Sequence, residues 1–287
     1  MSNLVRLVLL AVMAGPMPAT AQEVIAGVGF ENSEAARFDP ADDRYIVSNL
    51  GPRGAQDDGF ISLVSPEGEV LALKWIAGGI NGVRLQEPLG LFIAGDEVHV
   101  ADQKAIRVFD RQTGAPLRSI DIPDAVRLND LFVTEAGVTY VTDSGTADDH
   151  GALYRIQPDG TVEVFAERSA SLHRANGIAV NAAGQVVHGG LLSNVLTFRD
   201  AATGAILREQ TLPTGRIDGI VPLANGGLLV ASQDGHNVYH VPPEGEPREV
   251  AGGVPIPAAI GYDSSRRRLL VPQIVASSLT LFDIEVE

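Results

Sequence analysis

Four oxygen-bearing side chains recur at one position of a repeated sequence pattern, and together they could bind a divalent cation. They are Glu34, Asn129, Asn176 and Asp218. Two carboxylates and two amide carbonyls form a hard, charge-neutralising ligand set. Calcium suits it best, because this ion tolerates irregular geometry and takes about six to eight oxygens, whereas zinc would favour His or Cys. We therefore predict a divalent cation site, most consistent with Ca2+, whose remaining positions are filled by water or substrate.

A simpler explanation is that polar residues at strand starts only satisfy the backbone of nearby turns, as Asn and Asp often do. This explanation suffices for one isolated Asn-Gly or Asp-Gly pair. It is weaker for four occurrences at one repeat position, because the symmetry of the repeat brings the groups together. Glu31 competes with Glu34, but only Glu34 lies in the register that the last repeat defines.

The elements that must position these residues are short β-strands. Alternating or apolar segments separated by glycine-containing turns fill the chain from residue 22 onward, without a helical stripe over three turns. Glycine supplies the positive φ in the hairpin turns that follow an acidic or polar residue. These glycines are Gly68, Gly114, Gly160, Gly204 and Gly245. The sequence therefore predicts an all-β chain.

One hairpin pattern can be overlaid from repeat to repeat. Residues 34–39 match residues 258–263, and residues 45–47 match residues 269–271. The spacing between the two segments is the same in both copies. Equivalent starts recur at intervals of roughly 40 to 55 residues, as expected for propeller blades, and they fall at Glu34, Leu89, Asn129, Asn176, Asp218 and Ala258. We predict that residues 22–287 form a single six-bladed β-propeller domain, whose innermost strands place these starts around a central channel.

The last repeat lacks room for a fourth strand, whereas residues 23–30 precede the first repeat and need a partner. Pairing them as the outer strand of the sixth blade would remove two unpaired edges at once. We therefore predict that this N-terminal strand closes the ring.

A polar rim is expected above the ring of blade starts. The second strand of each blade runs antiparallel to the first, so its end returns to the face where the ring begins. Asp102, Asp143, His188 and Gln273 lie at such ends, and we predict that they contact the substrate. His188 is the histidine best placed to act as a base. The alternative is that each is only a solvent-facing strand end.

The motifs around the ring resemble the senescence marker protein, gluconolactonase and luciferin-regenerating-enzyme-like family of calcium-dependent, regucalcin-like, six-bladed propellers. The resemblance covers nearly the whole chain after residue 21. It is carried by Glu34 with Asp39-Pro40, Arg127-Leu128-Asn129-Asp130, Asn176-Gly177 and Asp218-Gly219. It implies that Glu34, Asn176 and Asp218 hold the metal. It further implies that Asn129 is a ligand or a substrate contact, and that Arg127 faces the substrate.

Together with a metal in this channel, the resemblance implies a hydrolase of the gluconolactonase-like type, acting on a lactone or related ester. Calcium would polarise the carbonyl group, and Asp218 could act as general base or nucleophile, or only as a ligand. The alternative is a non-catalytic propeller that binds a ligand or a protein and uses the cation to stiffen its channel. The motifs of serine hydrolases, nucleotide-binding loops and zinc proteases are missing from the sequence.

Composition limits the partners and the compartment. The chain has 36 acidic and 21 basic residues and no cysteine, so nucleic-acid binding, disulfides and thiolate zinc sites are poor explanations. Residues 1–21 have the charged start, short apolar run and Ala19-Thr20-Ala21 end of a secretory signal peptide. We expect cleavage after Ala21, no membrane insertion afterwards, and a periplasmic or secreted monomer acting on a small-molecule substrate.

Overall fold

The computed structural model describes residues 22–52, 56–146, 148 and 150–286. The predicted signal peptide, residues 1–21, lies outside the described residues. Within the described ranges the only helical element is the short 3-10 helix η1, Ala170–Leu172, so the all-β prediction is confirmed. No helix in these ranges is long and apolar enough to cross a membrane.

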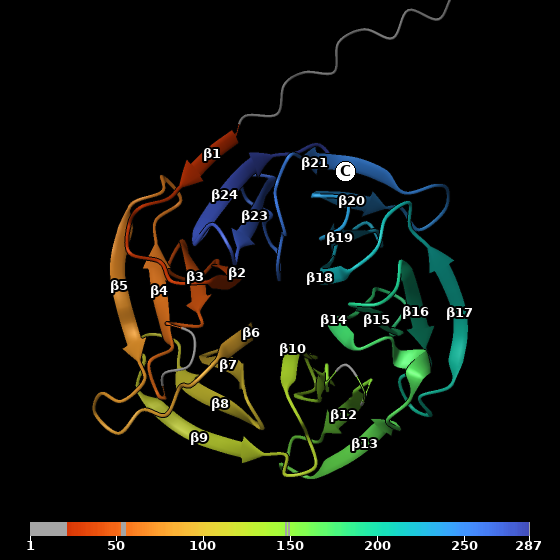
Figure 1. Ribbon diagram of the computed structural model, residues 1–287, viewed down its shortest axis with the longest axis horizontal. Coiled ribbons are helices and arrows are strands. Elements are labelled where there is room, and N and C mark those ends of the chain that lie inside the picture. The colour runs from red at the N-terminus through yellow and green to blue at the C-terminus, as the bar shows by residue number, and fades with distance from the viewer. Residues whose placement is uncertain (1–21, 53–55, 147, 149, 287) are drawn as a thin grey trace, which may run out of the picture.

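Six four-stranded antiparallel sheets stand around a central channel as the blades of a propeller (Figure 1). The innermost strands are β2 (Ser33–Asp39), β6 (Pro88–Ala94), β10 (Leu128–Val133), β14 (Ala175–Val180), β18 (Ile217–Pro222) and β22 (Gly261–Asp263). The second strands are β3 (Arg44–Asn49), β7 (Glu97–Asp102), β11 (Thr139–Asp143), β15 (Val186–Gly190), β19 (Leu228–Ser232) and β23 (Arg268–Gln273).

The two outer positions of each blade complete the sheets. The third strands are β4 (Phe60–Val64), β8 (Ala105–Asp110), β12 (Ala152–Ile156), β16 (Val195–Arg199), β20 (Asn237–Val241) and β24 (Ser278–Asp283). The outermost strands are β5 (Val70–Ala77), β9 (Pro116–Asp121), β13 (Val162–Ala166), β17 (Ile206–Thr211), β21 (Arg248–Gly252) and, in the sixth blade, β1 (Gln22–Ile25).

The ring is closed as predicted, because β1 pairs antiparallel with β24 and Val24 lies opposite Thr280. The closing strand is shorter than the predicted 23–30 and ends at Ile25. Gly27 and Gly29 follow with φ angles of +69° and +99°, which are incompatible with a continuing strand. The closure protects the edge of the last blade from pairing with other chains.

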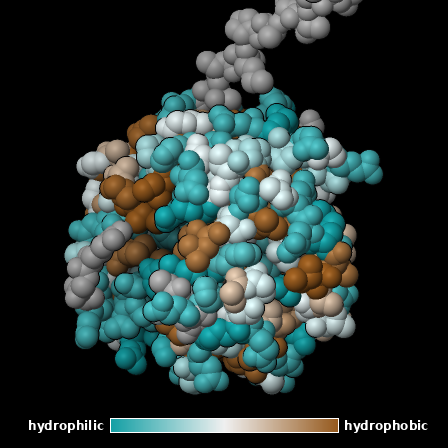
Figure 2. Space-filling view, turned by 45° about the vertical axis from the view of Figure 1, so that its right-hand side comes forward, coloured by the Kyte–Doolittle hydropathy of each residue, from teal (hydrophilic) through white to brown (hydrophobic). Residues whose placement is uncertain are grey.

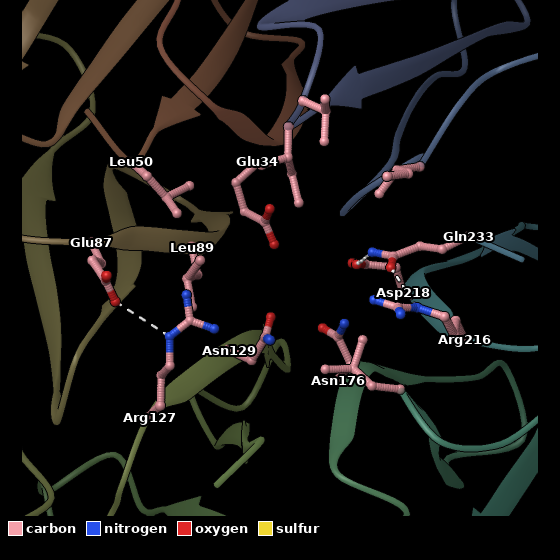
Figure 3. Close-up of a pocket in the computed structure, with 14 residues that line it drawn as sticks. Glu34, Leu50, Glu87, Leu89, Arg127, Asn129, Asn176, Arg216, Asp218 and Gln233 are labelled. Carbon is pink, nitrogen blue, oxygen red and sulfur yellow. Dashed lines mark hydrogen bonds and ion pairs between the residues drawn. The ribbon is translucent and has the colours of Figure 1, made fainter. Parts of the chain in front are cut away.

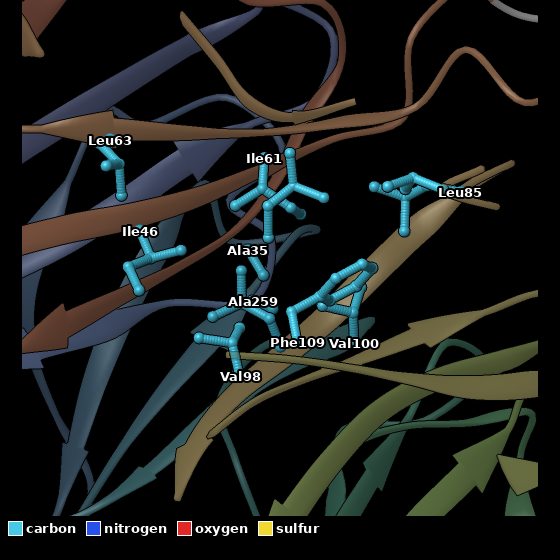
Figure 4. Packing of buried hydrophobic residues seen from close by; sticks show 12 residues of the cluster. Ala35, Ile46, Ile61, Leu63, Leu85, Val98, Val100, Phe109 and Ala259 are labelled. Atoms are coloured by element: carbon cyan, nitrogen blue, oxygen red, sulfur yellow. The ribbon is translucent and has the colours of Figure 1, made fainter. Parts of the chain in front are cut away.

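The hydrophobic core lies between neighbouring blades. Each adjacent pair of blades shares one buried apolar cluster, because strands buried on both faces present apolar side chains in both directions. Between the first two blades, Ile46 and Ile61 pack against Val98, Val100 and Phe109 (Figure 4). Burial of one such side chain contributes about 1.5–3 kcal/mol. The blades are therefore held in a ring that fixes the channel.

A β-bulge recurs at the channel end of the innermost strands. In the first blade Ser33 pairs with Asn49 and Ala36 pairs with Val47, so two residues of β2 oppose a single residue of β3. The register shifts at the same place in the next four blades. Bulges turn a side chain away from the regular alternation of a strand. Here the second residue of each of these strands lies in the bulge.

One face of the molecule is mostly polar. Figure 2 shows hydrophilic side chains over most of one face, with hydrophobic side chains in separate small patches.

Candidate functional site

The predicted ring residues meet in the channel. Glu34, Asn129, Asn176 and Asp218 are each the second residue of an innermost strand, and each is at most 4% exposed. Figure 3 shows the four side chains pointing from four blades toward one common space. The repeat equivalents in the two remaining blades are Leu89 and Ala258. The structure therefore brings the predicted ligands together on one axis.

Each of the four side chains presents a buried oxygen without a hydrogen-bond partner in the described part of the chain. These atoms are Glu34 Oε2, Asn129 Oδ1, Asn176 Oδ1 and Asp218 Oδ1. Burying a polar atom unpaired costs about 1–3 kcal/mol, so four such atoms in one place indicate a ligand that is not protein. Two carboxylate and two amide oxygens fit a hard cation such as calcium. Among the described residues, no cluster of three His, Asp or Glu side chains offers an alternative metal site.

Two of the remaining polar atoms of the ring are held by neighbours. Gln233 donates from Nε2 to Asp218 Oδ2 at 2.6 Å, and Asn129 donates from Nδ2 to Ser144 Oγ at 2.9 Å. These bonds fix two of the side chains so that their free oxygens face the channel.

The two ring carboxyls bind protons more tightly than usual when no cation lies beside them. Burial, and then repulsion from Asp130, raise the pKa of Asp218 to about 7. Burial, and then repulsion from Asp218, raise the pKa of Glu34 well above its ordinary value. A cation placed between the carboxylates would oppose both effects.

An ion pair between a partly exposed arginine and a buried carboxylate crosses the channel beside the ring. Arg37 of the first blade donates from Nη2 to Asp130 Oδ1 of the third blade at 3.2 Å. Its Nη1 also donates to the carbonyls of Ala36, Ala259 and Ile260 at 2.9, 3.1 and 2.7 Å. Arg37 therefore ties three blades together around the axis.

The ring forms part of the lining of a cavity of about 390 Å³. Polar side chains beyond the ring come from the second, third and fifth blades, and they are Glu87, Arg127, Arg216 and Gln233 (Figure 3). Arg127 donates from Nε to Glu87 Oε2 at 3.3 Å. Aliphatic side chains make up the rest of the lining: Leu50, Leu89, Leu191, Ile256, Ile274 and Val275. A cavity with a few convergent polar groups and apolar walls is typical of small-molecule sites.

Asp102 and Asp143, predicted on the rim, are buried and do not line this cavity. Asp102 Oδ1 accepts from the backbone N–H groups of Gln86 and Glu87, both at 2.8 Å. Asp143 accepts from the backbone N–H groups of Val126 and Arg127 at 2.9 and 2.8 Å. In the described structure these carboxylates hold the loops that carry Glu87 and Arg127, rather than facing the cavity themselves.

Gln273 lies in the same way behind the cavity lining. Its Nε2 donates to the carbonyl of Pro255 at 3.3 Å, and its Oε1 accepts from Thr280 at 2.8 Å.

His188 is also buried away from the cavity, where its Nε2 accepts from Arg199 Nε at 3.0 Å. Burial, and then the charge of Arg199, lower the pKa of His188 to about 3, so this imidazole is neutral.

Sequence reasoning missed several residues that line the cavity, and the repeat contains the signal that could have found some of them. The residues two places before the ring positions are Asn32, Glu87, Arg127, Arg174, Arg216 and Ile256. Four of these line the cavity, and only Arg127 was predicted to face it. Glu31, the competitor of Glu34, does not belong to the lining.

The fold and the site define a six-bladed β-propeller whose channel is lined by carboxylate and amide side chains. The chain belongs to the SMP-30/gluconolactonase/LRE-like family, whose sequence profile matches residues 32–271. This confirms the resemblance that the ring motifs indicate. Among curated proteins, no sequence matches this chain.

Solved structures share the fold at low sequence identity. A gluconolactonase from Xanthomonas campestris has a TM-score of 0.70 and 17% identity, over 93% of this chain and 90% of that one. The calcium-binding protein regucalcin from Agrobacterium tumefaciens has a TM-score of 0.67 and 17% identity, over 93% and 95%. Virginiamycin B lyase from Staphylococcus aureus has a TM-score of 0.66 and 11% identity, over 92% and 99%. Since the same fold serves different activities, these likenesses concern the fold alone.

Proposed function

We propose that this protein is an exported, calcium-dependent hydrolase that opens a lactone or a related ester in the channel cavity. The observation that carries the proposal is the set of four buried, unpartnered oxygens of Glu34, Asn129, Asn176 and Asp218. Membership of a family that includes gluconolactonases supports the reaction class. The sequence of residues 1–21 supports export, with cleavage after Ala21.

In this proposal the four ring residues hold the cation, and Arg127 orients the substrate from the cavity wall. When bound, calcium supplies Lewis-acid polarisation of the substrate carbonyl. Asp218 takes a proton from water as the water oxygen bonds to the acyl carbon. The acyl C–O bond then breaks, and the proton passes from Asp218 to the leaving alkoxide oxygen. The geometry supports Asp218 in this role because Gln233 donates to Oδ2, while Oδ1 accepts no hydrogen bond and has two lone pairs, one for the cation and one for the water proton.

A hydrolysis assay on the chain from Gln22 to Glu287 tests the proposal. Aldonolactones, alkyl lactones and aryl esters are each offered with calcium and again with a chelator. We expect hydrolysis that the chelator abolishes and that added calcium restores. Asp218→Asn should lower kcat by about 10²–10⁴-fold, the usual contribution of a general base. Asp96→Asn, at an exposed carboxylate far from the cavity lining, is the control and should retain the wild-type rate.

Two results would overturn this proposal. Hydrolysis that persists in chelator would show that the reaction does not require the metal. Calcium binding without turnover of any of these substrates would favour the non-catalytic alternative, a propeller that binds a ligand or partner and uses the cation to stiffen its channel.

A further inference from the structure

Apart from Glu34 of the ring, the part of the cavity wall that belongs to the sixth and first blades is aliphatic. Leu50 follows β3 in the first blade, and Ile274 and Val275 follow β23 in the sixth. Ile256 lies in the loop that leads into the innermost strand of the sixth blade. These two blades are neighbours in the ring, since Ala35 of β2 forms a β-bridge with Ala259, two residues before β22. We call these four residues the aliphatic wall.

Comparison of the repeats shows that the loops of the aliphatic wall do not require apolar residues. The residue directly after each second strand is Leu50, Gln103, Ser144, Leu191, Gln233 or Ile274. Three blades therefore carry a polar residue at this place, so the backbone accommodates one. Val275 is 69% exposed in the described structure, which leaves it with little packing to explain its apolar side chain. Ile256 and Ile274 are half-buried, and a partly exposed apolar patch beside a polar site is typical of a binding surface.

Ile256 keeps an apolar side chain at a position where the backbone disfavours it. Its φ is +50°, in the left-handed region, which a β-branched residue rarely adopts. Asn32, at the equivalent place of the first blade, has φ +55° and belongs to a residue type suited to that conformation. The Ile256 N–H donates to His236 Nδ1 at 3.4 Å, and Gln273 holds Pro255 beside it. Strained residues held in this way cluster at functional sites.

The polar groups of the lining beyond the ring lie on other blades. Glu87 and Arg127 belong to the second and third blades, and Arg216 and Gln233 to the fifth (Figure 3). A substrate whose carbonyl group lies at the ring can therefore place an apolar substituent on the aliphatic wall. A polyhydroxylated sugar lactone would instead place hydroxyl groups against side chains that offer no hydrogen bond.

We infer that the substrate is a lactone or ester with an aliphatic side chain, and that the aliphatic wall selects it over sugar lactones. This inference rests on the proposed hydrolytic function and adds the substrate class to it.

A chain-length series tests the inference. The calcium-loaded chain from Gln22 to Glu287 is assayed with γ-lactones whose alkyl substituents grow from methyl to hexyl, and with D-glucono-1,5-lactone. The γ-lactams with the same substituents, which resist hydrolysis, are titrated calorimetrically. We expect kcat/KM and lactam affinity to rise about fourfold per methylene until the wall is covered. We expect the sugar lactone to be hydrolysed at least tenfold less efficiently than the best alkyl lactone.

Variants assign the selectivity to the wall. Ile274→Gln introduces the residue that the second and fifth blades carry at the equivalent place, and Val275→Ser changes an exposed side chain. Each variant should lower kcat/KM for the γ-lactone with the longest substituent by about tenfold. The value for γ-valerolactone, which has only a methyl substituent, should change little. Leu207→Gln, at an exposed leucine on the outermost strand β17, is the matched control and should keep the wild-type slope.

The outcomes separate the two proposals. Chelator-sensitive hydrolysis that is independent of chain length, or that is fastest with the sugar lactone, overturns the aliphatic selectivity and leaves the hydrolase standing. If no lactone or ester is hydrolysed, the hydrolase proposal is overturned, and lactam binding then tests whether the aliphatic wall binds alkyl substituents. Lactam binding that tightens with chain length in wild type and not in Ile274→Gln then supports the wall, and binding that is flat in both overturns it.

Discussion

Gln233 and Asp218 form a hydrogen bond of 2.6 Å in the channel, from the amide Nε2 to carboxylate Oδ2. Gln233 Oε1 in turn accepts from Arg216 Nε at 3.1 Å, so the amide is fixed in orientation. One oxygen of Asp218 is thereby occupied, and the other is left free and buried at the ring. The orientation of the carboxylate that we assign to catalysis thus depends on the residue that directly follows the neighbouring strand β19.

Gln233→Leu should weaken the site without unfolding the blade. With the donor removed, Asp218 can rotate, and we expect calcium affinity or kcat/KM to fall by about 10–100-fold, as for other residues behind a metal ligand. Calorimetric calcium titration and initial rates measure the effect, and the melting temperature in chelator should change little. Gln112→Leu, at an exposed hairpin turn, is the control. Wild-type affinity and rate in Gln233→Leu would show that this hydrogen bond does not position Asp218.

Calcium should stabilise the protein through Glu34. A ligand at about 100 times its Kd adds about 2.7 kcal/mol to the free energy of unfolding, seen as a higher melting temperature. Glu34→Gln keeps the size of the side chain, removes the charge, and should abolish most of this shift. Glu31→Gln serves as the matched control, because Glu31 lies three residues earlier and outside the cavity lining. If the shift were instead lost only in Glu31→Gln, the metal ligand would be Glu31, and its assignment to Glu34 would be wrong.

The ion pair between Arg37 and Asp130 should matter chiefly when one partner is removed. Arg37→Met leaves the Asp130 carboxylate buried without its partner, and we expect a loss of about 3–5 kcal/mol in the free energy of unfolding. Adding Asp130→Leu removes the orphaned charge and should restore most of that loss. Urea denaturation of wild type and of the single and double variants forms the measurement. Equal stability of wild type and Arg37→Met would mean that the pair contributes nothing to the channel.

His188 should make the protein sensitive to acid. Its pKa is about 3 in the folded state, below the ordinary value of about 6.5 for the unfolded chain. Between these values the unfolded state binds a proton that the folded state does not, so the free energy of unfolding decreases as pH falls. At pH 4.5 the deficit relative to neutral pH is about 3 kcal/mol, at 1.4 kcal/mol for each pH unit.

The variant His188→Gln should remove this deficit, because a glutamine oxygen can still accept from Arg199 and does not titrate. Denaturation of both proteins at pH 7 and pH 4.5 gives the comparison, and the two should diverge only at the lower pH. Parallel losses in both proteins would show that another group causes the acid sensitivity.

The amino-acid sequence by itself determined the blade count, the closing strand and the ring of Glu34, Asn129, Asn176 and Asp218. These follow from local periodicity and from repetition, because residues at one repeat position must converge once the blades form a ring. The length of the closing strand was overestimated because Gly27 and Gly29 adopt positive φ angles that end it.

The tertiary structure alone decided which other side chains face the cavity. Asp102, Asp143 and Gln273 are the last residues of their strands, whereas His188 lies in the middle of β15. Each is turned toward a loop backbone or a neighbouring side chain. Arg37 and Asp130 meet across the channel although 93 positions separate them in the sequence. Side-chain direction at a strand end depends on which unpaired backbone groups and charges packing brings within reach, and strand periodicity carries no information about those long-range neighbours.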